Sequence, residues 1–142
     1  MAMKLIDKIL GNINVKKRLQ LQGKTSFLES VNHALDGLNY TAFRERNFRF
    51  ELVMMVLVLG AGLYFKISRL EFLILLLTIG SVLALELVNT AIERCVDLVT
   101  KDYHDLAKNA KDIAAGAVLV MSIFSVFVGI IIFLPRIIEM FR

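Results

Sequence analysis

Four polar side chains follow an apolar run at helical spacing in the segment LALELVNTAIERCVDL, residues 83–98. If this segment is a helix, Glu93 and Asp97 lie within ~20° of Glu86 around its axis, and Asn89 lies ~60° to one side. Glu86 follows a long apolar run, so we expect it near or inside a membrane boundary, where an ionised carboxylate costs at least a few kcal/mol. It should therefore be protonated, paired, bound to a metal ion or facing a wet cleft.

Carboxylates at two depths on one helix face suggest two chemical tasks. Glu93 is one heptad beyond Glu86 and should lie ~10 Å nearer the cytoplasm. This outer carboxylate can hold Mg²⁺, which takes oxygen ligands, typically one or two carboxylates plus substrate phosphates. The inner, poorly solvated carboxylate can take a proton from an alcohol. Glu45, at the start of an apolar segment, is a second candidate metal ligand.

Residues 101–112 supply groups suited to a nucleotide. Lys108 and Lys111 can contact phosphate oxygens, and Tyr103 and His104 can contact a base or a ribose. Each has a plainer alternative: the lysines as topology determinants, the tyrosine as an interfacial anchor, and the histidine as an ordinary exposed side chain. The acidic residues could likewise form a solvated helix face or an interhelical hydrogen bond, although function is the default hypothesis for an intramembrane carboxylate.

The composition indicates a membrane protein. Of the 142 residues, 57% are hydrophobic, and the mean hydropathy of +0.67 is well above the usual soluble average. Segment 113–134 carries no charge and suits a hydrocarbon core of ~30 Å. The shorter runs 52–65 and 72–85 become spans if flanking polar residues sit in the interface or face protein. We predict three transmembrane helices and, because no apolar core follows Lys4 and Lys8, no signal peptide.

The basic residues are unevenly distributed along a chain of net charge +4. Nine of the 17 Lys and Arg precede Phe50, and four more lie between residues 94 and 111. By the positive-inside rule, the N-terminus and the 101–111 connection are cytoplasmic and the C-terminus is outside. The basic balance suits anionic lipid head groups, whereas nucleic-acid binding lacks a recognised motif. Cys95 is the only cysteine, which excludes a disulfide framework and favours a small buried side chain.

We expect one domain preceded by a basic leader, residues 1–25. Ser26 and Glu29 resemble a capping box, and apolar residues recur after them at helical spacing. This pattern predicts an amphipathic helix over residues 26–43, lying on the cytoplasmic membrane face. The rest of the domain, to residue 142, should hold the three spans.

The three spans are expected at about residues 48–65, 70–100 and 112–134. A tight external connection at 66–69 should join the first two, and a polar connection at 101–112 the last two. The second span should continue as a helix past Asp97, and Pro135 should end the third span.

Four segments match a known pattern in order and spacing: ERNF at 45–48, ELVNTAIERCVD at 86–97, YH at 103–104 and AKDIAAGAV at 110–118. Together they resemble the small bacterial membrane diacylglycerol kinase family, which includes undecaprenol kinases. The resemblance covers about residues 37–135.

The resemblance implies a homotrimer of three-span subunits, each with an N-terminal surface helix, and active sites shared between neighbouring subunits. It implies that Glu86 is the catalytic base, that Glu45 and Glu93 bind Mg²⁺, and that Asn89 supports them. The predicted ATP-binding residues are Glu45, Glu93, Asp97, Asp102, Tyr103, His104, Lys111 and Asp112. The predicted lipid-binding residues are Glu86, Asn89, Asn47, Phe48, Arg49 and Glu51.

These observations predict an ATP-dependent, Mg²⁺-requiring lipid kinase in the cytoplasmic membrane. Undecaprenol is the favoured acceptor, because the ERNF segment and the IIIFLP ending, residues 130–135, look closer to the undecaprenol-kinase branch. Diacylglycerol is the alternative acceptor. A non-enzymatic membrane adaptor or channel subunit, whose acidic stripe binds ions, is the alternative of another class.

Overall fold

The computed structural model describes residues 26–142, and this part of the chain is helical without strands. The expected leader, residues 1–25, lies outside the described residues. Three of the helices are long and apolar enough to cross a membrane, which confirms the all-helical class and the three predicted spans. The helices are α3 (Phe27–Arg44), α4 (Arg46–Tyr64), α5 (Arg69–Val99) and α6 (Asp105–Met140).

Helix α3 forms where the sequence predicts an amphipathic helix. The Ser26 N–H donates to Glu29 Oε2 at 2.9 Å, so the carboxylate of the predicted capping box reaches back to the helix start. Its apolar side chains Phe27, Leu28 and Leu35 are exposed. From Leu38 onward the chain belongs to the compact unit that also contains the three long helices. The placement of α3 on a membrane surface stays a prediction.

Helices α4 and α5 are joined at the tight connection that the sequence predicts. Ser68 caps α5: its Oγ accepts from the Glu71 N–H at 3.3 Å, and Glu71 Oε2 accepts from the Ser68 N–H at 2.8 Å. This reciprocal capping box satisfies two backbone donors at the helix start. Lys66 adopts the left-handed conformation, with φ at 50°, which lets the chain reverse within a few residues.

The connection between α5 and α6 is shorter than predicted. Helix α6 begins at Asp105 rather than near residue 112, because His104 caps it, with Nδ1 accepting from the Leu106 N–H at 3.2 Å. The predicted polar connection is therefore wrong in its second half, which forms the first exposed turns of a helix. Lys108 and Asp112, four residues apart in these turns, form an ion pair that helps the helix.

Pro135 does not end the last helix, contrary to the prediction. Helix α6 continues to Met140. Proline removes one backbone donor and crowds the preceding turn, but membrane helices tolerate it. Here Arg136 donates from Nη1 to the Ile132 carbonyl and from Nη2 to Glu71 Oε2 at 2.8 Å, so its side chain ties this turn to the start of α5.

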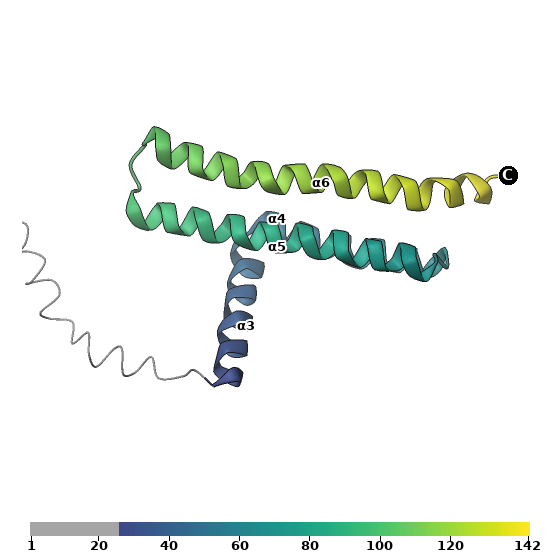
Figure 1. The fold of residues 1–142 in the computed structure, drawn as a ribbon, viewed down its shortest axis with the longest axis horizontal. Helices are drawn as coiled ribbons and strands as arrows, with labels where there is room; N and C mark the ends of the chain where they lie inside the picture. Colours follow the sequence, from purple (N-terminus) through teal and green to yellow (C-terminus); the bar gives the residue numbers. More distant parts are fainter. Residues whose placement is uncertain (1–25) are drawn as a thin grey trace, which may run out of the picture. The chain divides into compact units, whose positions relative to one another are not determined.

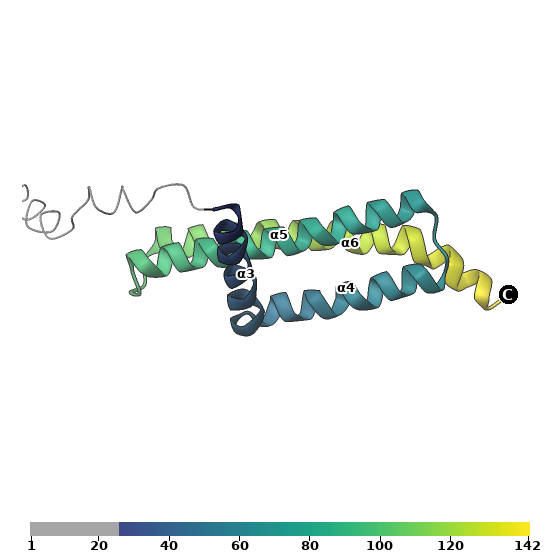
Figure 2. The same ribbon diagram turned by 90° about the horizontal axis from the view of Figure 1, so that it is seen from below.

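Helix α5 is the central element of the long helices. It runs antiparallel to α6 and lies beside it along most of its length (Figure 1), and it makes fewer contacts with α4, seen in Figure 2. Most large apolar side chains on the outward faces are exposed, as expected where lipid is the solvent. The buried residues of α5 are mainly polar: Thr78, Glu86, Asn89 and Thr90, with Leu75.

Candidate active site

Glu86 lies at the centre of the candidate site. Helix α5 holds it with only 3% of its surface exposed, even in the single chain. It lines a cavity of about 570 Å³ whose walls come from α4, α5 and α6. The sequence predicts that Glu86 is protonated, paired, bound to a metal ion or facing a cleft. The structure places it on the wall of a cavity. An acidic group held there can meet a hydroxyl that enters from the membrane.

Other carboxylates gather around Glu86. Glu51, on the second turn of α4, lines the same cavity and lies within electrostatic range of Glu86. Glu45 and Glu93 are also close enough to act on it. Each predicted metal ligand therefore lies within electrostatic range of the predicted base: Glu45 from the N-cap of α4, and Glu93 from the last turns of α5.

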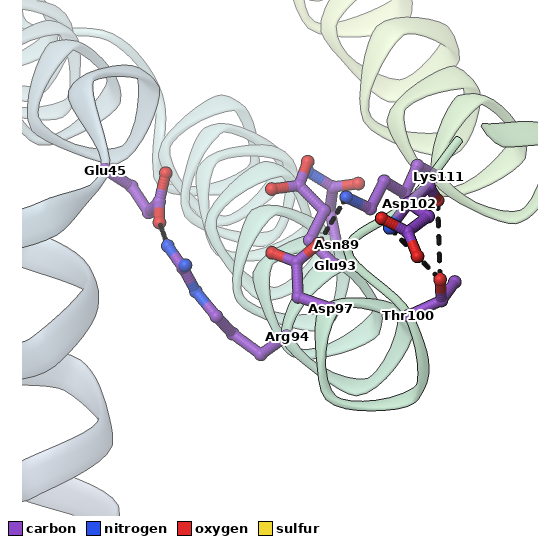
Figure 3. Close-up of polar contacts among 8 residues, drawn as sticks. All are labelled: Glu45, Asn89, Glu93, Arg94, Asp97, Thr100, Asp102 and Lys111. Carbon is purple, nitrogen blue, oxygen red and sulfur yellow. Dashed lines mark hydrogen bonds and ion pairs between the residues drawn. The ribbon is translucent and has the colours of Figure 1, made fainter. Parts of the chain in front are cut away.

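Asn89 holds the outer carboxylate by a hydrogen bond. Its Nδ2 donates to Glu93 Oε1 at 3.2 Å (Figure 3), and its Oδ1 is buried. Within residues 26–142, Asn89 Oδ1 and Glu51 Oε2 are the buried side-chain polar atoms without a hydrogen-bond partner. A buried oxygen left unpaired costs about 1–3 kcal/mol. Both residues line the cavity.

Glu45 is held by a basic residue that the sequence analysis did not single out. Arg94 Nη2 donates to Glu45 Oε1 at 2.5 Å across the gap between α4 and α5 (Figure 3). The Arg94 guanidinium also lies 5.6 Å from the centre of the Tyr40 ring, at a distance typical of a cation–π contact. The only sequence feature that could have pointed to Arg94 is its position directly after the predicted metal ligand Glu93.

Asp97 and Lys111 join α5 to the first turns of α6. Lys111 Nζ donates to Asp97 Oδ1 at 2.5 Å, and Figure 3 shows this pair close to Asn89 and Glu93. Asp102 lies in the connection between the helices, where its N–H donates to Thr100 Oγ1 at 3.1 Å. Two predicted ATP-binding residues, one from each helix, therefore meet next to the acidic stripe.

The remaining predicted nucleotide residues lie around the start of α6. Tyr103 donates from its hydroxyl to Asp105 Oδ1 at 2.9 Å, and its ring is exposed. His104 uses Nδ1 as the helix cap. Asp112 is engaged by Lys108 within the same helix. These side chains are on the same helix start as Lys111, each with an internal partner that a nucleotide would have to replace.

The predicted lipid-binding residues of α4 divide between two helix faces. Asn47 and Glu51 line the cavity, together with Arg46 and Phe50, which the sequence analysis missed. Phe48 and Arg49 are not among its lining residues. Phe48 is buried, and Arg49 donates from Nη1 to the Phe43 carbonyl at 2.9 Å. Helical periodicity was the available signal, since positions 46, 47, 50 and 51 share one face.

An apolar groove of about 340 Å³ continues from the cavity between α4, α5 and α6. Phe50, Glu51 and Ser122 line both spaces. Three hydroxyl side chains line the groove, and two of them donate to carbonyls of their own helices: Thr78 to Ile74 and Ser125 to Ser122. Most of the other lining residues are apolar, which suits a hydrocarbon tail.

A third cavity, of about 700 Å³, is also mostly apolar. Val88, Ala91 and Cys95 line it from α5, and Ala107 and Ala110 line it from α6. Cys95 is exposed in the single chain, so the expectation of a buried cysteine is wrong for this structure. By helical periodicity these α5 positions are opposite the acidic stripe.

Comparison with known proteins identifies the family. A family model described as prokaryotic diacylglycerol kinase matches residues 32–133. The chain belongs to the prokaryotic diacylglycerol kinase family. This result confirms the predicted family and the predicted enzyme class, a lipid kinase, and kinases of this family use ATP.

The similar proteins are named for two different lipid acceptors, undecaprenol and diacylglycerol. The chain is 47% identical over 110 residues to an undecaprenol kinase of Bacillus subtilis, covering 78% of this chain and 89% of the relative. It is 40% identical over 116 residues to a diacylglycerol kinase of Synechocystis sp., covering 81% and 66%, respectively. It is 29% identical over 104 residues to a diacylglycerol kinase of Escherichia coli, covering 73% and 85%. With three apolar helices, this lipid kinase is a multi-pass membrane protein.

The carboxylates of this kinase fit a divalent cation bound together with phosphates. Among the described residues 26–142, no three or more His, Cys, Asp or Glu side chains form a group that could hold a metal ion. Mg²⁺ in phosphoryl transfer needs only one or two carboxylates, because phosphates and water complete its shell. Glu45 and Glu93, the two predicted ligands, come from the start of α4 and the later turns of α5.

Proposed function

We propose that this protein transfers the γ-phosphoryl group of ATP to the hydroxyl of a membrane lipid, with Glu86 as the general base. The observation that carries the proposal is the placement of Glu86: an acidic residue 3% exposed, on the wall of a cavity that opens into an apolar groove. A lipid lying in the groove would present its hydroxyl to this carboxylate.

The step is a displacement at phosphorus. Glu86 accepts the hydroxyl proton while the lipid oxygen forms a bond to the γ-phosphorus. The bond from that phosphorus to the oxygen bridging the β- and γ-phosphates breaks, and ADP leaves. Glu45 and Glu93 would hold Mg²⁺, which, when bound, neutralises charge on the phosphate oxygens. Asn89 would orient Glu93 through the amide hydrogen bond.

The nucleotide would lie against the outer residues of the site. Lys111 would exchange Asp97 for a phosphate oxygen, and the residues around the start of α6 would contact the base and ribose. Lys111 and Asp97 are both partly exposed in the present pair, with 37% and 39% of their side-chain surfaces accessible. Such a pair contributes about 1 kcal/mol or less, so a triphosphate can displace it at low cost.

We propose undecaprenol as the principal acceptor. Most residues that line the groove are apolar, and the Thr78 and Ser125 hydroxyls there donate to backbone carbonyls. Such a lining suits a ligand with one hydroxyl and a long hydrocarbon tail. The likeness to the Bacillus subtilis undecaprenol kinase supports the same acceptor. Diacylglycerol is the second candidate.

We further propose that the N-terminus and the α5–α6 connection are cytoplasmic, that the C-terminus is outside, and that the protein works as a homotrimer in the cytoplasmic membrane. The uneven distribution of Lys and Arg supports the orientation. The family resemblance supports the trimer and the sharing of active sites between subunits. In this arrangement α3 would lie on the cytoplasmic membrane surface.

The proposal can be tested with purified protein in mixed micelles, given labelled ATP and either undecaprenol or diacylglycerol. We expect kcat/KM for undecaprenol to be higher by at least about tenfold, or about 1.4 kcal/mol. A value equal to or below that of diacylglycerol would refute the acceptor, and no phosphorylation of either lipid would refute the kinase activity. Ion flux without ATP consumption would favour a channel subunit instead.

Glu86→Gln should abolish lipid phosphorylation while ATP still binds, because the amide cannot accept the proton. Glu139→Gln is the matched control, since Glu139 is exposed near the end of α6 and touches no part of the site. Wild-type turnover by Glu86→Gln would remove Glu86 from the role of base.

A further inference from the structure

Arg94 connects three segments near the acidic stripe. On α5 it follows Glu93, its Nη2 donates to Glu45 Oε1 at 2.5 Å, and its guanidinium carbon lies 5.6 Å from the centre of the Tyr40 ring. These partners lie at the start of α4 and in the last turns of α3. The reaction proposed above gives this arginine no task.

Arg94 determines the direction of the Glu45 side chain. Glu45 is the N-cap residue of α4, with φ at −98° and ψ at 121°, yet its side chain makes no capping bond to the N–H groups of its own helix. It extends instead to a residue 49 positions later in the chain. Without Arg94, the nearest donors for this carboxylate would be the free N–H groups of the first turn of α4.

The ion pair uses one oxygen of the carboxylate and leaves the other available. Among residues 26–142, Glu45 Oε2 has no hydrogen-bond partner, while Oε1 is held by Arg94. Carboxylates that bind metal ions are commonly fixed in this way by a hydrogen bond to the oxygen that does not bind, or to both. The 22% exposure of the Glu45 side chain keeps the second oxygen accessible.

The charge of Arg94 is compatible with a bound metal–nucleotide complex. Asp97 lies within electrostatic range of Arg94 and offsets part of its charge. Mg-ATP carries a net negative charge, so a guanidinium beside the site favours its binding although it does not favour a bare cation. The planar guanidinium also holds both the carboxylate and the ring with less loss of freedom than a lysine would.

We propose that Arg94 is a positioning residue that holds Glu45 by one carboxylate oxygen, so that the other oxygen can ligate the metal ion of Mg-ATP. This inference rests on the proposed function, in which Glu45 is a metal ligand. It assigns Arg94 an effect on metal binding that passes through Glu45 and does not require contact with the lipid.

The test measures metal binding directly. Mn²⁺ replaces Mg²⁺, and its binding in the presence of a non-hydrolysable ATP analogue is followed by electron paramagnetic resonance on the full-length protein. Arg94→Gln should weaken Mn²⁺ binding by about tenfold or more. Arg94→Lys should restore only part of the affinity, because it keeps the charge but loses the fork and the stacking on Tyr40. Arg69→Gln, on the exposed first turn of α5, is the control and should match the wild type.

A double-variant cycle shows whether Arg94 acts through Glu45. Glu45→Gln alone should weaken Mn²⁺ binding, and adding Arg94→Gln to it should change the affinity little further. Wild-type or tighter Mn²⁺ binding by Arg94→Gln would overturn the inference, as would fully additive losses. If the wild type phosphorylates lipid but Arg94→Gln binds Mn²⁺ normally, only the role of Arg94 fails. If the wild type binds neither Mn²⁺ nor nucleotide, the proposed function fails as well.

Discussion

The nitrogen and the oxygen of the Asn89 side-chain amide have different surroundings. The Nδ2 atom is engaged by Glu93, and the Oδ1 atom is buried without a partner in the described part of the chain. An amide in this position holds the outer carboxylate through its N–H donor. A carboxylate in its place would lack the donor that Glu93 uses.

Removing the Asn89 amide should therefore reduce turnover. Asn89→Ala is expected to lower kcat by about tenfold or more, because Glu93 loses its hydrogen-bond donor. Phosphorylation of undecaprenol at saturating lipid measures the effect. Asn109→Ala is the matched control, since Asn109 is exposed on α6. An unchanged kcat would show that the amide does not support the reaction.

The sequence predicts the acidic stripe because the angular spacing of residues on one helix is fixed by helix geometry. It does not predict the role of Arg94, which depends on where Glu45 arrives from a different helix. The predicted lipid-binding residues of α4 show that the sequence alone also does not separate cavity-lining positions from their neighbours. Asn47 and Glu51 line the cavity, whereas their neighbour Arg49 bonds a carbonyl at the end of α3.

Among the described helices, α5 has a complete capping box, which satisfies backbone N–H groups at its N-terminus. Ser68 and Glu71 form both halves of a capping box, and Arg136 adds a contact from the far end of α6. The S-x-x-E spacing at 68–71 was readable in the sequence, whereas the contact from Arg136 was not. These groups fix the start of α5 and the last turns of α6 relative to each other.

Loss of the cap should destabilise the helix start without changing the site. Ser68→Ala is expected to cost about 1 kcal/mol, measured by reversible unfolding in detergent mixed with sodium dodecyl sulfate. Ser81→Ala is the control, because the Ser81 hydroxyl donates to the Leu77 carbonyl within α5. Equal stabilities of the two variants would contradict the role assigned to the capping box.

The boundaries of α6 show what element-level prediction misses. Its first turns contain charged residues that resemble a connection in the sequence, yet the His104 cap and the Lys108–Asp112 pair make them helical. Pro135 resembles a stop signal, but α6 continues past it to Met140, and Arg136 contacts the Ile132 carbonyl and Glu71. Both errors have one cause: side-chain partners that decide the helix ends are not apparent from composition.

At the scale of the whole molecule, the orientation in the membrane can be checked by labelling. In a Cys95→Ala background, Arg142→Cys should react with a membrane-impermeant maleimide on intact spheroplasts. Lys101→Cys should react only after the membrane is opened, because the positive-inside rule places it in the cytoplasm. Both positions are exposed in the structure. The reverse labelling pattern would invert the proposed topology.

Sharing of sites within a trimer gives a quantitative expectation for mixed subunits. Glu86→Gln and Lys111→Ala should each be inactive alone. If the base and the nucleotide contact come from neighbouring subunits, random mixing restores about a quarter of the wild-type sites. If one subunit supplies both groups, co-assembly restores none, and the composite site is refuted. Subunit stoichiometry in detergent should be measured in parallel.

Helix α5 buries the polar residues Glu86 and Asn89, whereas most large aliphatic side chains of the protein face outward. This distribution determines which positions tolerate amino-acid substitution. Outward positions meet a solvent as apolar as leucine itself, so exchanges among aliphatic residues there alter little. In a saturation-mutagenesis library selected for growth that depends on the kinase, outward-facing positions should therefore keep many different amino acids. Positions of the acidic stripe should keep almost no amino acids other than the original ones. Water-soluble enzymes usually show the reverse, with apolar interiors and variable polar surfaces.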